Sequence, residues 1–327
     1  MGDSKRRPLA GRRSVLLGMA GLASAALSAC ANSGSPAVPT ASGTEPAMGN
    51  APVTGPATPP PSIAARSSEQ AAAALAPAGP STGPSTGPSA PPAAPGKEQV
   101  LAEFAGRNPK EWGLHVTGVV NRSASAKVAL TFDACGGHGG TGCDHTLLQT
   151  LRRLNVPATL FVNSRWIHAN PGLFAELAAD PLFELANHGT AHLPLSVNGK
   201  SAYGIQGTAS VAAAYDEVMG NQQILQELTG RVAQFFRPGT AFYDDVAVDM
   251  TRRLGMLPVN FTVNGDGGAT YSAATVAAEV GRAAAGDIVI SHFNRPAAGT
   301  AGGYARALPR LLDHGVSFGR LGDVLTP

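Results

Sequence analysis

The sequence predicts an α/β fold in which a parallel sheet closes, or nearly closes, into a distorted (β/α) barrel of about seven strands. From residue 128 onward, short apolar runs rich in β-forming residues alternate with helical patterns, which is typical of repeated β/α units. After the first 96 of 327 residues, on the order of 230 residues remain, enough for one domain with a full core. A doubly wound open sheet is the alternative for the same alternation.

The expected strands are short runs of β-branched, aromatic and other apolar residues, at 128–132, 158–162, 183–186, 234–236, 258–262, 287–290 and 316–321. Helical patterns lie between them, at 144–154, 171–179, 210–229, 244–254, 273–285 and 301–314. Asp144 and Ser272 are suited to cap helix N-termini, and Gly255 is suited to end a helix after Leu254. Because the carboxyl ends of parallel strands converge, residues that follow different strands can share one pocket.

The N-terminus, Met1–Ala29, is predicted to be an export signal, because a basic start is followed by an apolar stretch of small residues. The segment Arg12–Leu17 resembles a twin-arginine signal, and Leu27–Cys30 resembles a lipobox with lipidation at Cys30. An ordinary secretory peptide or an uncleaved anchor is the alternative. We therefore expect an exported protein that is lipid-anchored on the outer face of the cytoplasmic membrane or periplasmic.

Residues 31–96 are almost entirely Ala, Pro, Ser, Thr and Gly, and include a short Gly-Pro-Ser-Thr repeat. Such a composition cannot bury enough apolar surface to offset its conformational entropy, so a disordered linker is expected here. We expect residues 97–327 to form one catalytic domain. No segment after the signal approaches the ~20 apolar residues that a membrane-spanning helix needs, so attachment to the membrane is expected through the N-terminal lipid alone.

The charge balance argues against a nucleic-acid partner. Removing residues 1–29 takes away five bases and one acid, which turns a net charge of +2 into −2. A duplex-binding surface requires a basic excess, and none is visible. The expected partner is a neutral or weakly charged molecule outside the cell, and we expect a monomer.

With Cys30 assigned to the lipobox, Cys135 and Cys143 remain as an even pair in an oxidising compartment. They are predicted to form a disulfide that closes the glycine-rich loop between them. A structural zinc site that also uses His138 and His145 is the alternative, but its spacing is tighter than usual for such sites.

Side chains suited to proton transfer and metal binding occur at, or just after, the ends of the expected strands: Asp133, His188, His192, Arg237, Asp266 and His292. A pocket built from them suits metal-assisted hydrolysis, because a bound metal lowers the pKa of its water to ~7. His188 and His192 are nitrogen donors four residues apart, close enough for one ion if the turn between them is tight. Two structural histidines are the alternative interpretation.

These residues lie in segments that resemble the five ordered motifs of the polysaccharide deacetylases, the NodB-homology domain of carbohydrate esterase family 4. The resemblance spans about 127–325. It implies a distorted (β/α) barrel, a divalent metal that is usually zinc, and removal of acetyl groups from sugars. The matching segments are Ala129–Asp133, Asn187–His192, Phe236–Gly239, Asp266 and Ile288–His292.

The resemblance also implies the roles of individual residues. Asp133 is the expected general base, and His292 the general acid that protonates the departing sugar nitrogen. Arg237 is expected to orient Asp133 and keep it ionised, and Asp266 to hydrogen-bond His292 and favour its protonated form. Arg237 and Asp266 as ordinary ion-pair partners are the alternative.

The sequence departs from the family pattern at Ala134, where a second aspartate usually binds the metal. Two histidines leave a catalytic zinc one protein ligand short, and our hypothesis is that Asp144 replaces the missing ligand; simple capping of a helix is the alternative. His138 and His145 are weaker substitutes.

Two further positions are candidates for contact with substrate. The family usually has an aromatic residue where this chain has Thr240, whose backbone N–H is still expected to help hold the oxyanion. Ile290 either lines a pocket for the acetyl methyl group or is plain core.

The predicted function is that of a metal-dependent deacetylase acting on N-acetylated amino sugars of a cell-envelope or exported polysaccharide, peptidoglycan or chitin-like. One alternative is an O-acetyl esterase acting on a glycan such as xylan. The other is a catalytically inactive glycan-binding lipoprotein. The expected partners are an acetylated glycan and, through the lipid anchor, the membrane.

Overall fold

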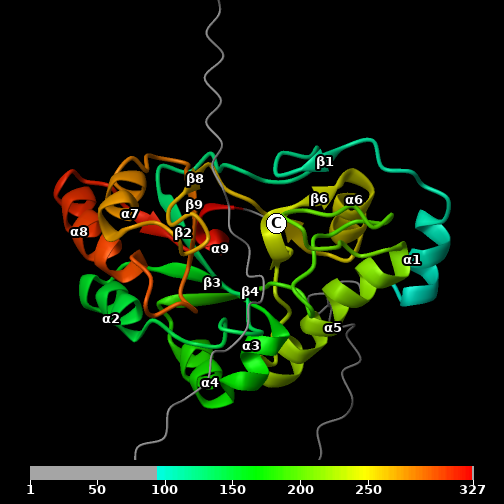
Figure 1. Ribbon diagram of the computed structural model, residues 1–327, viewed down its shortest axis with the longest axis horizontal. Coiled ribbons are helices and arrows are strands. Elements are labelled where there is room, and N and C mark those ends of the chain that lie inside the picture. Colours follow the sequence, from blue (N-terminus) through cyan, green and yellow to red (C-terminus); the bar gives the residue numbers. More distant parts are fainter. Residues whose placement is uncertain (1–93, 326–327) are drawn as a thin grey trace, which may run out of the picture. The chain divides into compact units, whose positions relative to one another are not determined.

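The computed structural model describes residues 94–325, and a curled parallel sheet is its central feature (Figure 1). The hydrogen-bonded order of its strands is β7-β5-β4-β3-β2-β9-β8, and β10 pairs with the start of β2. All of these pairings are parallel, as predicted. The strands are β2 (Val128–Ala134), β3 (Ala158–Val162), β4 (Phe183–Asn187), β5 (Phe235–Phe236), β7 (Leu257–Pro258), β8 (Val263–Asn264), β9 (Ile288–His292) and β10 (Phe318–Gly319).

The two ends of the sheet, β7 and β8, belong to one segment of the chain. The predicted strand 258–262 is therefore wrong in its bounds, because the segment changes partners in its middle. Val259 N still donates to Phe236 O, next to β5, whereas Thr262 N donates to Ile288 O of β9. A single bent segment thus brings both edges of the sheet together, and the prediction of a distorted barrel with about seven parallel strands is confirmed.

Strand β2 lies at the centre of the sheet, and its side chains alternate between the two faces. Leu130, Phe132 and Ala134 pack in the large apolar core that the helices α2, α7 and α8 also line. Ala129 packs in a second cluster, with Phe161 of β3 among its members. The residues that share a face with Ala129 are therefore directed into the barrel, and Asp133 is among them.

The six predicted helices are present within one or two residues of their expected bounds, except that the helix expected at 273–285 ends at Val280. Asp144 and Ser272 accept hydrogen bonds from the first turns of their helices, and Gly255, with a φ of 84°, follows the end of α6. The helices are α1 (Lys97–Phe104), α2 (His145–Leu154), α3 (Ser164–Ala169), α4 (Pro171–Ala179), α5 (Val211–Thr229), α6 (Asp245–Arg253), α7 (Ala273–Val280), α8 (Thr300–Asp313) and α9 (Leu321–Val324).

Three of these helices, α1, α3 and α9, were not predicted, and the last of them begins inside the expected strand 316–321. A two-stranded antiparallel ribbon lies apart from the main sheet and joins β1 (Trp112–Gly113) to β6 (Tyr243–Asp244). The helix α1 packs against α5 and α6. These additions extend the fold without disturbing the order of the barrel strands.

The predicted export signal, Cys30 and nearly all of the predicted linker lie outside the described residues. The first described helix begins at Lys97, where the catalytic domain is expected to begin. Among residues 94–325, no helix combines the length and the apolar character that crossing a bilayer requires.

Candidate active site

Asp133 and His292 lie opposite each other on neighbouring strands, as register partners of β2 and β9. Both strands are buried along almost their whole length, so the two side chains are held on a rigid sheet. Adjacent strands are about 4.8 Å apart. A carboxylate and an imidazole are thereby positioned side by side at the carboxyl edge of the sheet.

Asp133 is held by Arg237, as predicted. Arg237 Nη1 donates to Asp133 Oδ1 at 2.8 Å, and both side chains are almost completely buried. The guanidinium also donates to Thr131 Oγ1 and to the carbonyls of Val259 and Asn260. Because these bonds fix Oδ1 on the arginine, Oδ2 is the oxygen that remains for a ligand or a proton.

His292 is held by Asp266, also as predicted. Asp266 Oδ1 lies 3.0 Å from His292 Nδ1, and Oδ2 accepts from the backbone N–H of His292 at 2.7 Å and from Thr300 Oγ1. Burial lowers the pKa of His292, but the charge and hydrogen bond of Asp266, helped by Cys135, outweigh it and raise the pKa well above its ordinary value. His292 is thus suited to hold a proton on Nε2.

His188 and His192 lie on a tight turn that follows β4. Asn163 holds the start of this turn, since the side-chain Nδ2 of Asn163 donates to the carbonyls of His188 and Gly189. His192 has a φ of 62°, a left-handed conformation that bends the chain so that its ring meets the His188 ring edge-to-face, with the centroids 4.9 Å apart. The expectation that a tight turn brings the two histidines together is confirmed.

Glu217 of α5 holds the other end of this turn. Its carboxylate accepts hydrogen bonds from the backbone N–H groups of Ala191, at 2.9 Å, and Leu193, at 3.1 Å, on either side of His192. Burial raises the pKa of Glu217 above its ordinary value, and the two N–H donors act against that rise. The sequence reasoning missed this residue, because a glutamate in a helical pattern carries no local signal for a loop 25 residues away.

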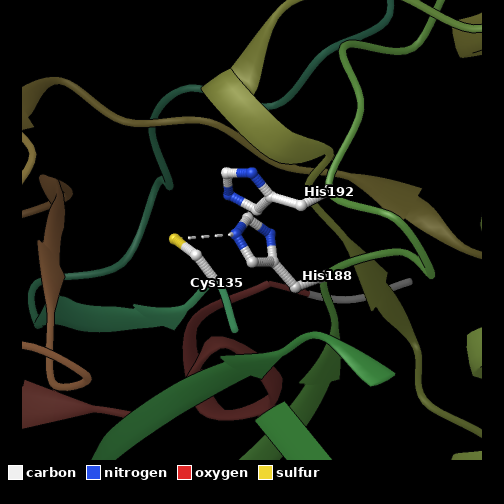
Figure 2. Close-up of side chains that lie close together, drawn as sticks. All are labelled: Cys135, His188 and His192. Atoms are coloured by element: carbon white, nitrogen blue, oxygen red, sulfur yellow. Dashed lines mark hydrogen bonds between the residues drawn. The ribbon is translucent and has the colours of Figure 1, made fainter. Parts of the chain in front are cut away.

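Cys135 completes a cluster with the two histidines, and Figure 2 shows the three side chains directed toward one another. The Sγ atom lies 3.9 Å from His188 Nε2, and one ligand atom from each residue lies within 4.8 Å of the others. Tetrahedral zinc with bonds of about 2.0–2.3 Å separates its ligand atoms by roughly 3.5 Å. The three donors therefore fit one such ion after small adjustments of their side chains.

The hydrogen bonds of His188 leave the correct ring nitrogen free for a metal. Nδ1 lies 2.7 Å from the carbonyl oxygen of Arg237, which can only accept, so Nδ1 carries the proton. Nε2 then faces Cys135 Sγ and Asp133 Oδ2, the latter at 3.7 Å, and in the neutral ring its lone pair is available to a metal. A backbone carbonyl that fixes the tautomer in this way is the usual support of a metal-binding histidine.

The predicted disulfide between Cys135 and Cys143 is wrong, since both residues are free thiols. Cys143 packs against the large core between the sheet and the helices, whereas Cys135 faces the histidines. Hydrogen bonds hold the intervening loop instead: Gly136 N donates to Gly140 O, and Trp166 Nε1 donates to Gly142 O. Burial and the neighbouring acids Asp144 and Glu176 raise the pKa of Cys143 to about 12, so this residue is an ordinary thiol.

Asp144 is not part of the cluster. Its Oδ1 accepts from Leu147 N at 3.0 Å, and its own N–H donates to Phe293 O, so the carboxylate caps α2 in the helix layer. The hypothesis that Asp144 replaces the missing metal ligand is therefore wrong, and the alternative of helix capping is what the structure shows. His138 and His145 are exposed and do not belong to the cluster either.

Thr240 lies in a short 3₁₀ turn, Gly239–Ala241, that packs on His192. A Cβ atom on Gly239 would lie 2.2 Å from the carbonyl oxygen of His192, so only glycine allows this contact. Thr240 itself has a φ of 68°, which is strained for a β-branched residue and is of a kind that clusters at functional sites. Its role at the oxyanion stays a prediction.

Ile290 pairs in register with Thr131 of β2 and is 7% exposed. It lies two residues before His292 on β9, so the two side chains share the face of the sheet that forms the site. This position is compatible with either interpretation from the sequence, and contact with an acetyl methyl group stays a prediction.

Comparisons with known proteins agree with this architecture. Residues 121–259 match the family model described as polysaccharide deacetylase. A search of curated proteins found no match. Solved structures with a similar fold include a peptidoglycan N-acetylglucosamine deacetylase, Bc1960, with 21% identity over 64% of this chain and 92% of that chain, and a TM-score of 0.53.

Two other similar structures come from named organisms. PdaA of Bacillus subtilis, a family 4 carbohydrate esterase, has 18% identity over 69% of this chain and 87% of that chain, with a TM-score of 0.52. A family 4 pseudoenzyme of Bacillus anthracis has 20% identity over 65% of this chain and 70% of that chain, with a TM-score of 0.54. Residues 121–259 thus carry the match to the polysaccharide deacetylase family, on a fold shared with the family 4 carbohydrate esterases.

Proposed function

We propose that this protein is a metal-dependent hydrolase that removes acetyl groups from N-acetylated amino sugars of a cell-envelope or exported polysaccharide. The observation that carries the proposal is the pairing of Asp133 and His292 across β2 and β9, each held by a buried partner of opposite charge. A hydrolase of amides requires a base to activate water and an acid to protonate the leaving nitrogen, and these two residues supply both.

The hydrogen bonds of Asp133 and His292 indicate a different role for each residue. Asp133 Oδ2, which Arg237 does not engage, accepts the proton of the attacking water. His292 donates its Nδ1 proton to Asp266, whose charge favours the doubly protonated ring, and delivers the second proton, on Nε2, to the sugar nitrogen as the C–N bond breaks. A divalent metal at His188 and His192, when bound, would make water more acidic and polarise the acetyl carbonyl. We assign zinc, the metal that imidazole and thiolate donors favour.

The intact acid favours N-acetyl over O-acetyl substrates. An amine is a poor leaving group unless it is protonated, whereas an ester alkoxide depends less on an acid. The His292–Asp266 pair, with the pKa of His292 raised well above its ordinary value, provides such an acid. The same pair, together with Asp133 and Arg237, argues against an inactive glycan-binding protein despite Ala134.

The proposed substrate lies outside the cytoplasm. The basic and apolar start of the chain and the Leu27–Cys30 segment support export and a lipid anchor at Cys30. An envelope glycan would then lie within reach of residues 97–327, the proposed catalytic domain. We also propose that the protein acts as a monomer.

We expect the full-length protein to release acetate from N-acetylated chitin or peptidoglycan fragments and to lose this activity on chelation. Adding zinc back should restore the activity. Acetate is measured on a panel that also contains O-acetylated xylan, which separates a deacetylase from an esterase. Release from the O-acetylated glycan alone, or undiminished activity after metal has been removed, would overturn the proposal.

Glu217→Gln is expected to weaken metal binding by about 10–100-fold, the usual effect of losing a group that orients a metal ligand. A neutral amide has one acceptor oxygen and cannot satisfy both N–H groups that flank His192. Zinc affinity is measured by calorimetry, with Glu227→Gln, an exposed position of the same helix, as the control. Equal affinities in the two variants would show that Glu217 does not position His192.

A further inference from the structure

We infer that Cys135 binds the metal as a thiolate and is the third protein ligand of the site, in place of the carboxylate that Ala134 lacks. This inference rests on the proposed metal-dependent function and adds a ligand set of one sulfur and two nitrogens. The chemistry of that set also selects the ion.

The position of Cys135 follows from the geometry of β2. Successive side chains of a strand point to opposite faces, so residues 133 and 135 share one face and residue 134 faces the other. Ala134 is completely buried in the core between the sheet and the helices. A carboxylate in that apolar layer would be costly. The chain instead places a donor side chain one residue later, on the face that carries Asp133.

The surroundings of Cys135 are those of a ligand rather than of a structural thiol. Its carbonyl oxygen accepts from Arg165 Nη2, which fixes the backbone, and its Sγ lies 3.9 Å from His188 Nε2, the ring nitrogen that does not contact the Arg237 carbonyl. One ligand atom from each of Cys135, His188 and His192 lies within 4.8 Å of the other two. Cys143, eight residues later, has its pKa raised to about 12 and faces the core.

A sulfur ligand restricts the metals that the site accepts. Thiolate and imidazole donors favour zinc and cobalt, whereas magnesium, calcium and manganese favour oxygen. Three protein ligands leave a fourth position for water or substrate, which is the arrangement of catalytic zinc sites. Cys135 would donate a sulfur electron pair to a bound metal, and its thiol proton would be released to solvent. No change of oxidation state is involved.

The test uses cobalt, whose bond to a thiolate gives a charge-transfer absorption band in the near ultraviolet. Metal-free full-length protein is titrated with Co²⁺, as are Cys135→Ser, Cys135→Asp and the matched control Cys143→Ser. We expect one ion per chain and the band in the unsubstituted protein and in Cys143→Ser. Cys135→Ser should lose the band and bind the ion at least about 100-fold more weakly. This loss of affinity exceeds the usual loss when a residue that only orients a metal ligand is removed.

Cys135→Asp tests the ligand role independently of folding. A carboxylate at this position should restore much of the affinity that Cys135→Ser loses, but without the band. Unchanged affinity and spectrum in Cys135→Ser would overturn the inference, as would an acetyl thioester trapped on Cys135 in metal-free protein. If the band is present but no N-acetylated glycan is deacetylated, the ligand assignment stands and the proposed function falls.

Discussion

Replacing Asp133 with Asn is expected to lower acetate release by about 10²–10⁴-fold, the range for losing a positioned general base. The amide occupies the same volume and can still accept a hydrogen bond from Arg237, but it cannot take a proton from water. Since Asp133 Oδ2 lies 3.7 Å from His188 Nε2, the missing charge borders directly on the metal cluster. The variant also leaves the buried Arg237 without its charged partner, so kcat is compared on folded protein at equal concentration.

The measurement compares kcat on an N-acetylated glycan with the metal content of the same preparation. Asp249→Asn is the matched control, because Asp249 is an exposed surface partner of Arg107 and lies on α6. We expect the control to keep its activity and both variants to bind metal. If Asp133→Asn retained more than about a tenth of the activity, another residue would have to be the base.

Replacing Arg237 with Met is expected to destabilise the protein by about 3–5 kcal/mol, because it leaves Asp133 as an unpaired buried charge. The Arg237 side chain is 0% exposed and that of Asp133 is 4% exposed, so water cannot replace the lost partner. Arg237 also packs over the ring of Phe161, and its removal leaves the carbonyls of Val259 and Asn260 without that donor. The free energy of unfolding is measured by urea denaturation.

The control for this prediction is Arg253→Met, which breaks a surface pair with Glu103 and should cost at most about 1 kcal/mol. The double variant Asp133→Asn with Arg237→Met should be more stable than Arg237→Met alone, since it removes the buried charge as well. A stability of Arg237→Met equal to that of Arg253→Met would mean that the pair does not support the barrel.

The helices and most strands follow from the pattern of apolar residues. Periodicity locates α4 at Pro171–Ala179, with the bounds that the structure shows, and Asp144 and Ser272 are recognisable as caps from their residue type. The strand at 257–264 is less predictable. Its hydrogen bonds change from β5 to β9 halfway along, and such a change of partners leaves no trace in local composition.

Among the site residues, the sequence determined those that follow strand ends and pair by charge. The pairs Asp133–Arg237 and Asp266–His292, and the meeting of His188 with His192, are present as predicted, because parallel strands bring their carboxyl ends to one edge. The ligand that we propose, Cys135, is not the one that the sequence suggested, since proximity in the chain favoured a bond between Cys135 and Cys143 and made Asp144 the candidate.

The contacts of Cys135, Asp144 and Glu217 follow from the packing of elements that are distant in the chain. The direction of each side chain determines its partner: Cys135 shares the face of Asp133, while Cys143 and Asp144 face the helix layer. Glu217 reaches the His192 turn from a helix that is distant in sequence. Residue types and strand order therefore determine which acids, bases and metal donors lie at the carboxyl edge of the barrel. The direction and packing of the side chains determine which of these residues contact one another.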